Sequence, residues 1–598
     1  MLAAPRVPSS ESCILGVQQS LLGRRWISRG GDDRLGLALA QRLSVPEIVG
    51  RMMASRGVDL DTAGSFLNPT LRDLLPDPSR LQDMEKAAGR IVGAIRAQEP
   101  IAVFGDYDVD GATSAALLHR FFAAIGVPLR IYIPDRMTEG YGPNLPALLK
   151  LRGEGMSVVI TVDCGTTAFA PLEGAADAGL DVIVADHHTA EPSLPRAAAV
   201  INPNRLDDSS RCGQLAAVGV TFLLIVAINR ALRAAGWYGN GRAEPDLKQW
   251  LDLVALGTVC DVVPLTGVNR ALVAQGLKVM ARRGNPGLAA LGDAARLSET
   301  PSAYHAGFIL GPRINAGGRV GQSDLGARLL STDDPLVAAD LARRLEAMNA
   351  ERRLLEQSVL DDAVGRVERE ARDDRFLLVA AEGWHPGVIG IVAARLKERY
   401  NRPACVAAIE NGVAKGSGRS IPGFDMGSAI IAARQAGLLI NGGGHAMAAG
   451  FTVAADKIAA LRGFVADRVA ELGMDGLTPV LSVDATLSAR GASVEVAQLV
   501  EKLGPFGSGN SEPRFVIPDL RVARADIVGE NHVRAFLAGA DGTRLKAIAF
   551  RSVDSALGPA LLGAKSAPLH VAGHLRTDSW QGQIGVQFQI DDAAVAVG

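Results

Sequence analysis

Three aspartates occupy alternate positions of one short segment, the sequence GDYDVDGATS at residues 105–114. Asp106, Asp108 and Asp110 follow a short apolar run and precede an apolar helical pattern at 112–125. Carboxylates gathered in one turn repel one another unless a cation neutralises them. Taken alone, the segment is compatible with a metal site, with a solvated loop or with a single Ca²⁺ site.

More carboxylates and two histidines follow other apolar runs. They are Asp163, the triplet Asp186-His187-His188, and Asp261. Ligands of open α/β sheets bind beyond the carboxyl ends of the strands, so we expect these side chains to meet in one crevice. Oxygen ligands suit Mg²⁺ or Ca²⁺, and an added imidazole shifts the preference towards Mn²⁺. Two such ions about 3.5–4 Å apart could share a carboxylate and activate a water for attack on phosphorus.

The two adjacent histidines are expected to have different roles, because neighbouring side chains at a strand end point in different directions. We assign His187 to the metal and His188 to the phosphate of the substrate. Without the neighbouring acids, two structural histidines that cap a strand would explain the pair equally well.

Two glycine-rich segments combine a flexible backbone with groups that hold phosphate. One is GSGRS at 416–420, which is equally compatible with an ordinary surface turn. The other is GPRINAGGR at 311–319, where Arg313 and Arg319 could reach a phosphate beside the metals and Asn315 is a further candidate contact.

Two further residues are candidate substrate contacts. His445 ends a run of three glycines that would let the backbone approach the same crevice. Tyr141, between two glycines, could stack on a base. A structural role is an equally good interpretation for each of them.

The elements that must position these residues follow from the hydrophobic pattern. Apolar strands alternate with helices and predict a parallel α/β sheet, then a long charged helix, a smaller α/β region and a β-rich region. We expect five parts: an N-terminal extension (1–78), a catalytic domain (79–332), a connecting helix (333–372), a second α/β domain (373–471) and a small β-barrel or sandwich (472–598).

Composition narrows the class of protein. The 598 residues exclude a single small module, and 48% hydrophobic with 21% charged residues exclude wholesale disorder. The formal charge of -2 excludes a strongly basic nucleic-acid coat protein, so any polyanion is expected on a local patch. Five scattered cysteines and the lack of a long uncharged apolar run favour a cytoplasmic protein without membrane association, with an N-terminal transit peptide as the alternative.

The motifs resemble those of the DHH phosphoesterase superfamily, and in particular its RecJ-type single-stranded-DNA-specific exonucleases. The resemblance covers most of residues 80–470 and implies a DHH domain, a long helix, a DHHA1 domain and a C-terminal OB-like domain. The matching segments are GDYDVDGATS (105–114), PDRMTEGYG (134–142), VDCG (162–165), DHH (186–188), GTVCDVVPL (257–265), GPRINAGGR (311–319), GWHPGVIGIVAARL (383–396), GSGRS (416–420) and GGGHAMAAGF (442–451).

The resemblance also implies a site for two Mn²⁺ or Mg²⁺ ions. Its ligands would be Asp106, Asp108, Asp110, Asp163, His187 and Asp261. Of these, Asp108, Asp110, Asp163 and His187, together with His188, would be the catalytic residues. Some superfamily members have a histidine four residues before the central aspartate; here that residue is Phe104, and Asp106 could take over its coordination.

The implied activity is 5′→3′ hydrolysis of single-stranded DNA to nucleoside 5′-monophosphates, in DNA repair and recombination. Ser417 and Arg419, with an arginine of 311–319, would hold the 5′ end. The implied partners are single-stranded DNA, a single-strand-binding protein and a helicase, with the chain acting as a monomer. A DHH phosphodiesterase for short oligonucleotides or small molecules, and a metal-stabilised scaffold without turnover, are the alternatives.

Overall fold

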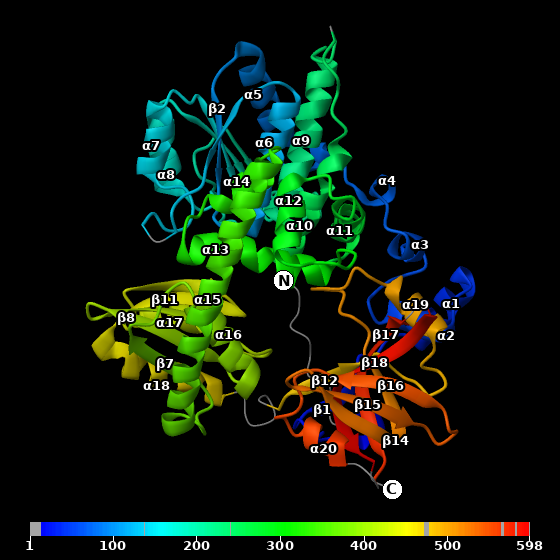
Figure 1. Cartoon of the computed structure of the whole chain (residues 1–598). Helices are drawn as coiled ribbons and strands as arrows, with labels where there is room; N and C mark the ends of the chain where they lie inside the picture. The colour runs from blue at the N-terminus through cyan, green and yellow to red at the C-terminus, as the bar shows by residue number, and fades with distance from the viewer. Residues whose placement is uncertain are drawn as a thin grey trace. The chain divides into compact units, whose positions relative to one another are not determined.

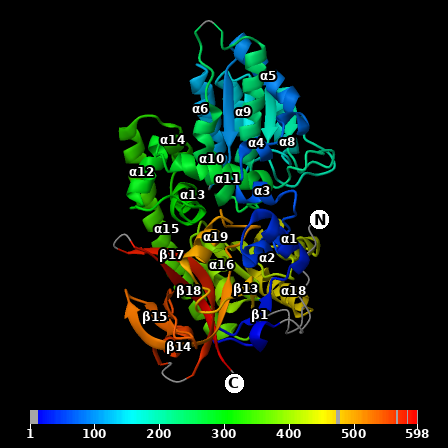
Figure 2. The same ribbon diagram turned by 90° about the vertical axis from the view of Figure 1, so that its right-hand side faces the viewer.

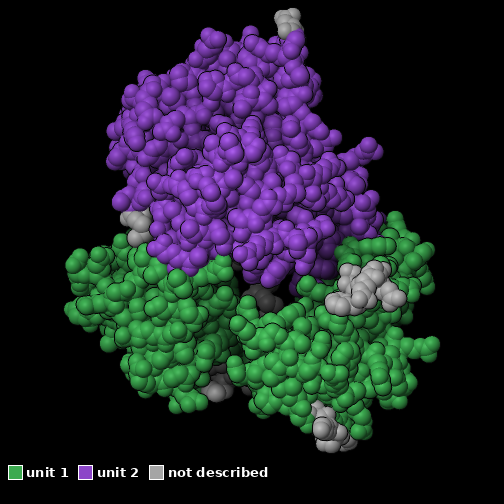
Figure 3. Space-filling model, in the orientation of Figure 1, with its two compact units in different colours: residues 1–60, 352–502, 513–598 green, residues 61–351, 503–512 purple. Residues whose placement is uncertain are grey.

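The computed structural model describes residues 13–136, 138–239, 241–471, 478–563, 567–580 and 583–596. The chain divides into two compact units, coloured separately in Figure 3. One unit comprises residues 61–351 and 503–512, and the other residues 1–60, 352–502 and 513–598. The division falls within α15 (Pro335–Glu370), one continuous helix of 36 residues.

The unit of residues 61–351 is built on a five-stranded sheet in which every pairing is parallel. The strand order is β3-β2-β4-β5-β6, so the chain reverses direction across the sheet at β2. The neighbouring strands β2 (IAVFG) and β4 (VVITV) are almost wholly apolar, and all their residues are buried. The strands are β2 (Ile101–Gly105), β3 (Leu129–Tyr132), β4 (Val158–Val162), β5 (Asp181–Ala185) and β6 (Ala199–Ile201).

Helices cover both faces of this sheet (Figure 1). Alternate strand residues pack on α5, α6, α9 and α10 in one core and on α7 and α8 in another. The helix α9 is long and apolar enough to cross a membrane, but 72% of it is buried in the protein, as in a core helix. The bounds are α5 (Met84–Ala97), α6 (Val109–Ala124), α7 (Leu145–Gly153), α8 (Phe169–Asp177), α9 (Ala217–Ala234) and α10 (Leu251–Cys260).

Further helices follow in the same unit. They are α3 (Ala63–Leu67) and α4 (Leu71–Leu74) before the sheet, and α11 (Gly267–Met280), α12 (Pro286–Ala294), the π-helix η5 (His305–Leu310), α13 (Gly311–Val320) and α14 (Leu325–Ser331) after it. The prediction that residues 311–319 form a flexible segment is therefore wrong, because these residues form α13. The glycines permit close packing: a Cβ on Gly311 would lie 2.5 Å from the sulfur of Cys260.

The second unit contains a five-stranded mixed sheet of order β10-β11-β9-β8-β7. The segment 416–420, expected to be flexible, mostly lies in β9, where a Cβ on Gly416 would lie 2.1 Å from the ring of Phe451. The bounds are β7 (Leu377–Glu382), β8 (Ala404–Glu410), β9 (Val413–Arg419), β10 (Asn441–His445), β11 (Ala448–Ala454), α16 (Ile389–Tyr400), α17 (Met426–Gln435) and α18 (Ile458–Ala470).

The same unit contains a six-stranded sheet of order β13-β14-β15-β16-β18-β17. An additional β14–β17 pairing closes five of these strands into a barrel, which confirms the OB-like fold. The expected start of this region at residue 472 lies outside the described residues. The elements, labelled in Figure 1 or Figure 2, are β12 (Val480–Val483), β13 (Ala485–Thr486), α19 (Val494–Glu501), β14 (Phe515–Val528), β15 (His532–Ala538), β16 (Arg544–Ala549), α20 (Leu557–Gly563), β17 (Leu569–Trp580) and β18 (Gln583–Val595).

The N-terminal residues are part of this barrel region. The strand β1 (Arg25–Ser28) pairs in parallel with β12 and is followed by α1 (Asp33–Leu43) and α2 (Glu47–Ala54). Trp26 is fully buried and donates its indole hydrogen to Asp592 at 3.1 Å. The structure thus does not set residues 1–78 apart as one extension, since residues 1–60 and 61–78 belong to different units.

Candidate metal centre

The acidic residues gather at the carboxyl edge of the parallel sheet. Asp106 follows β2, Asp163 follows β4, and the Asp186-His187-His188 triplet follows β5. The expectation that a strand delivers Asp261 is wrong, because this residue caps the C-terminus of α10. Residues 251–258 are all buried, so their largely apolar sequence gives no helical period.

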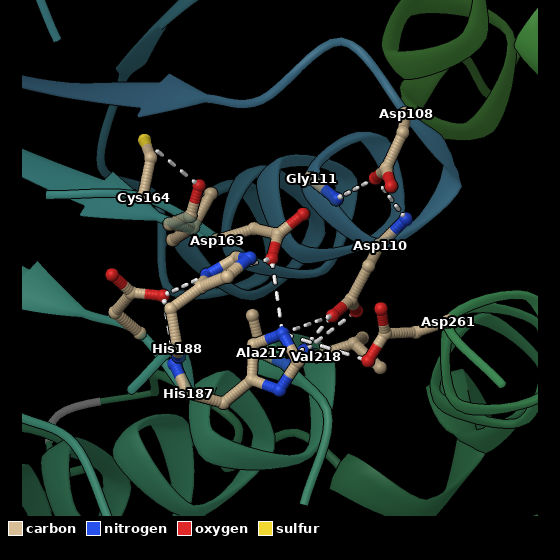
Figure 4. A network of polar contacts seen from close by, with 12 residues as sticks. Asp108, Asp110, Gly111, Asp163, Cys164, His187, His188, Ala217, Val218 and Asp261 are labelled. Atoms are coloured by element: carbon tan, nitrogen blue, oxygen red, sulfur yellow. Dashed lines mark hydrogen bonds and ion pairs between the residues drawn. The ribbon is translucent and has the colours of Figure 1, made fainter. Parts of the chain in front are cut away.

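Candidate metal ligands form two groups that share Asp163, and His188 is a further candidate because it is grouped with Asp163 and His187. Figure 4 shows the residues around His187. In the first group, His187 Nε2 lies 3.4 Å from Asp163 Oδ1, 3.5 Å from Asp261 Oδ2 and 4.0 Å from Asp110 Oδ2. The second group is Asp106, Asp108 and Asp163, with ligand atoms all within 4.8 Å of one another. The structure thus brings together all six residues expected to bind metal.

Several buried atoms of these groups have no protein hydrogen-bond partner. They are Asp106 Oδ1, Asp163 Oδ1, His187 Nε2 and Asp261 Oδ2. Buried polar atoms are normally satisfied, so several atoms without a partner at one place indicate a binding site for an ion. All four atoms are metal donors, and a set of carboxylate oxygens with one imidazole fits Mn²⁺ or Mg²⁺.

The pKa values of the metal-free site point the same way. Burial, then the charge of a neighbouring aspartate, raises the pKa of Asp110 to about 7 and that of Asp261 to about 9. The same causes raise the pKa of Asp106 and of Asp163 well above the usual value. Burial lowers the pKa of His187 to about 4, so its imidazole is neutral at neutral pH, the form that binds metal.

Helix starts hold two of the carboxylates. Asp108 caps α6 by accepting hydrogen bonds from the backbone of Asp110 at 2.8 Å and of Gly111 at 3.1 Å. Asp110 accepts from the backbone of Ala217 at 2.7 Å and of Val218 at 2.9 Å, the first two residues of α9 (Figure 4). The N-terminal dipole of α9 therefore stabilises the ionised form of Asp110 and fixes its orientation.

His188 is oriented by Asp186, whose Oδ1 lies 2.7 Å from His188 Nδ1. Burial is the largest single influence and opposes the charge of His188, but this hydrogen bond and the charges of Asp186, Asp106 and Asp110 together outweigh it, so the pKa of His188 lies above its usual value. Tyr141 lies against the same ring: its hydroxyl is 3.3 Å from the ring nitrogens and donates to the backbone oxygen of Asp163 at 3.1 Å. The expected contact residue Tyr141 is thus beside the site.

Sequence reasoning missed two asparagines that hold the histidines. Asn202 is fully buried and donates to the backbone oxygen of His188 at 2.8 Å. Asn204 donates to the backbone oxygen of His187. Their sequence, Asn-Pro-Asn directly after β6, is an ordinary turn signal, so only the fold identifies them as positioning residues.

The arginines near this centre differ in their surroundings. Arg313, expected to reach a phosphate, is buried and committed to Glu346 on α15 and to the backbone oxygen of Ile309 at 2.6 Å. Sequence reasoning did not single out Arg136, whose guanidinium carbon lies 5.0 Å from the centre of the Tyr107 ring. Its positive charge partly offsets the rise in the pKa of Asp106 that burial causes.

Two other expected contacts of this unit lie on α13. Asn315 and Arg319 are both half-buried there. The charge of Arg319 acts on Tyr107, the residue between two of the candidate ligands, so this arginine lies on the side of the second ligand group.

The remaining expected contacts lie in the other unit. On β9, Arg419 Nη1 donates to Ser417 Oγ at 2.9 Å, and a Cβ on Gly390, in the first turn of α16, would lie 3.0 Å from that Oγ. Burial lowers the pKa of Arg419, and no carboxylate among the described residues pairs with it. A helix start beside a buried guanidinium and a hydroxyl is suited to an anion. His445 is exposed at the end of β10.

Three family models match the chain. The DHH family, N-terminal domain, matches residues 100–258, the DHHA1 domain matches 373–471, and the RecJ OB domain matches 483–592.

Similar proteins cover nearly the whole chain. The single-stranded-DNA-specific exonuclease RecJ of Bacillus subtilis is 34% identical over 96% of this chain and 71% of its own length. The protein of the same description from Escherichia coli is 37% identical over 86% and 90%, respectively. The crystal structure of RecJ in complex with Mn²⁺ from Thermus thermophilus has a TM-score of 0.79 at 30% identity, covering 95% of this chain and 78% of that one. Its complex with Mg²⁺ has a TM-score of 0.74 at 28% identity and the same coverage.

Proposed function

The chain belongs to the RecJ family of single-stranded-DNA-specific exonucleases, a family of DHH nucleases, and from this premise we propose its reaction in detail. It removes nucleotides one at a time from the 5′ end of single-stranded DNA and releases nucleoside 5′-monophosphates. Its cofactors are two ions of Mn²⁺ or Mg²⁺. The observation that carries the proposal is the carboxylate of Asp163, which belongs to both ligand groups.

The two ions divide the ligands as the contacts suggest. Asp110, His187 and Asp261 would hold one ion, Asp106 and Asp108 would hold the other, and Asp163 would contribute to both. Phe104 stands where some members of the superfamily have a histidine. It is fully buried in the core that contains α7 and α8, and its ring stacks on that of Tyr132 with centroids 5.3 Å apart, so it takes no part in coordination. When bound, such a pair of ions supplies a hydroxide nucleophile and stabilises charge on the phosphate.

The protein's own residues orient the phosphate and the protons. His188, held by Asp186, whose hydrogen bond favours the protonated ring, would donate a hydrogen bond to a non-bridging phosphate oxygen. Water attacks the phosphorus between the first and second nucleotides, and the bond from phosphorus to the 3′ oxygen breaks. The 3′ oxygen takes a proton, the first nucleotide leaves with its own 5′-phosphate, and the shortened strand keeps the attacked phosphate at its new 5′ end.

The anion site of β9 then sets the polarity of digestion. Ser417, Arg419 and the first turn of α16 would hold the terminal 5′-phosphate. Because each cycle leaves a new 5′-phosphate on the strand, the same pocket can bind the substrate of the next cycle. His445 stays a further candidate contact in this unit.

The outer face of the barrel is suited to hold the downstream strand. The strand registers place in one row, across five strands, three basic side chains, an aromatic ring and an amide: Arg524, Phe536, Lys546, Gln587 and Arg576. Basic and aromatic groups on an OB-fold bind a single strand through its backbone charge and its bases. A role in repair and recombination, a single-strand-binding protein, a helicase and a monomeric state stay predictions from the family.

A labelled-strand nuclease assay tests the proposal. The full chain with Mn²⁺ is given one strand labelled at its first or its last nucleotide, its duplex form, and a dinucleotide. We expect a labelled 5′-mononucleotide at once from the first label, late release of the last label, and little attack on the duplex. Early release of the last label refutes the polarity. Preference for the dinucleotide favours a short-oligonucleotide phosphodiesterase, and no turnover favours a scaffold.

A further inference from the structure

Two large aromatic side chains stand exposed on the surface of the catalytic unit. Tyr304 is 58% exposed and Phe308 is 70% exposed, and their rings stack with centroids 5.2 Å apart at an interplanar angle of 28°. We call them the aromatic pair. Aromatic side chains are large apolar groups that proteins normally bury, so two stacked rings left in water indicate a binding surface.

The aromatic pair is held in place by its surroundings. The ring of His305 packs edge-on against Tyr304 with centroids 5.7 Å apart. His305 Nδ1 in turn accepts a hydrogen bond from the backbone of Ser302 at 3.1 Å. The pair is therefore ordered before any ligand arrives, and binding costs little side-chain entropy.

The element that carries the pair packs on the metal centre. Phe308 lies within the π-helix η5, a form often found at functional sites. On the inner side of η5, a Cβ on Gly307 would lie 3.3 Å from Val259, and the sulfur of Cys260 donates to the backbone oxygen of Ala306 at 3.5 Å. Cys260 is the residue before the candidate ligand Asp261, so the helix that carries the pair packs directly on the end of α10 that carries this ligand.

The residue after that ligand adds a third exposed apolar group. Val262 is 68% exposed and has a φ of 60°, a left-handed conformation that β-branched residues rarely adopt. Backbone strain of this kind concentrates at functional sites. The strain turns an apolar side chain outward directly beside the metal ligands.

We propose that the aromatic pair is a base-stacking platform for the single-stranded substrate beside the scissile phosphate. The proposal rests on the proposed nuclease function. Unpaired bases offer flat π-faces to exposed rings, and stacking of this kind tolerates any sequence, as an exonuclease requires. A protein partner would need about 800 Å² of surface, far more than two rings provide.

A binding experiment with altered rings and altered strands tests the platform. The full chain is kept in a chelator, so that nothing is hydrolysed. Its Kd is measured for 5′-phosphorylated strands of about 20 nucleotides, a length that spans several stacked bases, with an abasic site placed at each position in turn. The variant Tyr304→Leu with Phe308→Leu keeps apolar bulk and loses the π-faces. Tyr304→Phe with Phe308→Tyr keeps both rings, and Leu336→Ala removes another exposed apolar side chain of the same unit, one that is 82% exposed.

Stacking predicts that the effects of ring and base are coupled. We expect the double leucine variant to raise the Kd of the intact strand about tenfold, and the ring-exchange and Leu336→Ala variants to bind like wild type. At one or two strand positions an abasic site should weaken the wild type but weaken the leucine variant no further. An unchanged Kd for the double leucine variant, or additive effects of ring and base at every strand position, overturns the proposal of a platform. An unchanged Kd would instead favour a protein partner for the aromatic pair. Failure of the wild type to degrade single strands refutes the nuclease function instead, since the binding experiment needs no turnover.

Discussion

The carboxylate shared by both ligand groups provides the sharpest test of the metal centre. The change is Asp163→Asn, which keeps the shape of a side chain that is 2% exposed and removes its charge. Loss of one electrostatic group at a reaction centre costs about 2.7–4 kcal/mol, or about 10²–10³ in turnover. Because Asp163 belongs to both groups, we expect a loss of at least about 10³.

The same change has an opposite expected effect on the metal-free protein. Burial and the charges of Asp108, Asp110, Asp106 and Asp261 raise the pKa of Asp163, so a neutral amide relieves repulsion. The melting temperature without metal should stay equal or rise. Mn²⁺ at 100 times its Kd should stabilise the wild type by about 2.7 kcal/mol, roughly 5 °C for a unit of this size, and should stabilise the variant much less.

Turnover and calorimetric melting with and without Mn²⁺ check both expectations. Asp177→Asn, which removes a surface carboxylate paired with Arg196, is the matched control and should change neither. Retention of more than about a tenth of the activity, or an undiminished Mn²⁺-induced rise in melting temperature, would refute the bridging role. A lower melting temperature without metal would show that Asp163 stabilises the fold rather than the ions.

Three further outcomes follow from the site. Raised carboxyl pKa values stabilise the metal-free fold at low pH, so its melting temperature should fall as the pH rises through about 7 for Asp110 and about 9 for Asp261. Saturating Mn²⁺ should reverse this dependence on pH. A melting temperature of the metal-free protein that does not change with pH contradicts the prediction. Arg419→Ala should lower turnover on 5′-phosphorylated strands by about 10- to 100-fold and much less on 5′-hydroxyl strands. Equal losses in a two-substrate assay would place this arginine in general strand binding. Asn204→Ala should raise the Kd for Mn²⁺ or lower kcat by about 10- to 100-fold, through movement of His187, while calorimetry shows a folded protein; unchanged metal binding and kcat would make it a plain turn residue.

Local patterns were sufficient to predict the core of the catalytic centre. Asp106 and Asp163 directly follow short apolar strands, and Asp108 and Asp110 open the next helix, so their meeting point follows from the parallel sheet alone. The family and the fold class are confirmed by the comparisons and by the sheet topology. The barrel also followed from short strands with turn residues between them.

Features that depend on distant contacts could not be predicted in this way. Asp261 was expected at a strand end because a fully buried helix shows no polar face. Gly311 and Gly416 were interpreted as flexible because sequence does not show which neighbour comes within 3 Å of a glycine. The role of Asn202 depends on a backbone oxygen that only the fold brings near.

The contacts of the β1 region join residues near the N-terminus to residues that are synthesised much later. Trp26 and Ser20 leave the ribosome early, yet their hydrogen-bond acceptor Asp592 follows 566 and 572 residues later. At about 5–20 residues per second, Trp26 and Ser20 wait on the order of half a minute to two minutes for this acceptor. This segment is therefore fully ordered only long after it is synthesised, and a nascent or truncated chain that lacks β18 leaves Trp26 and Ser20 without their acceptor and exposes the tryptophan to chaperones and proteases.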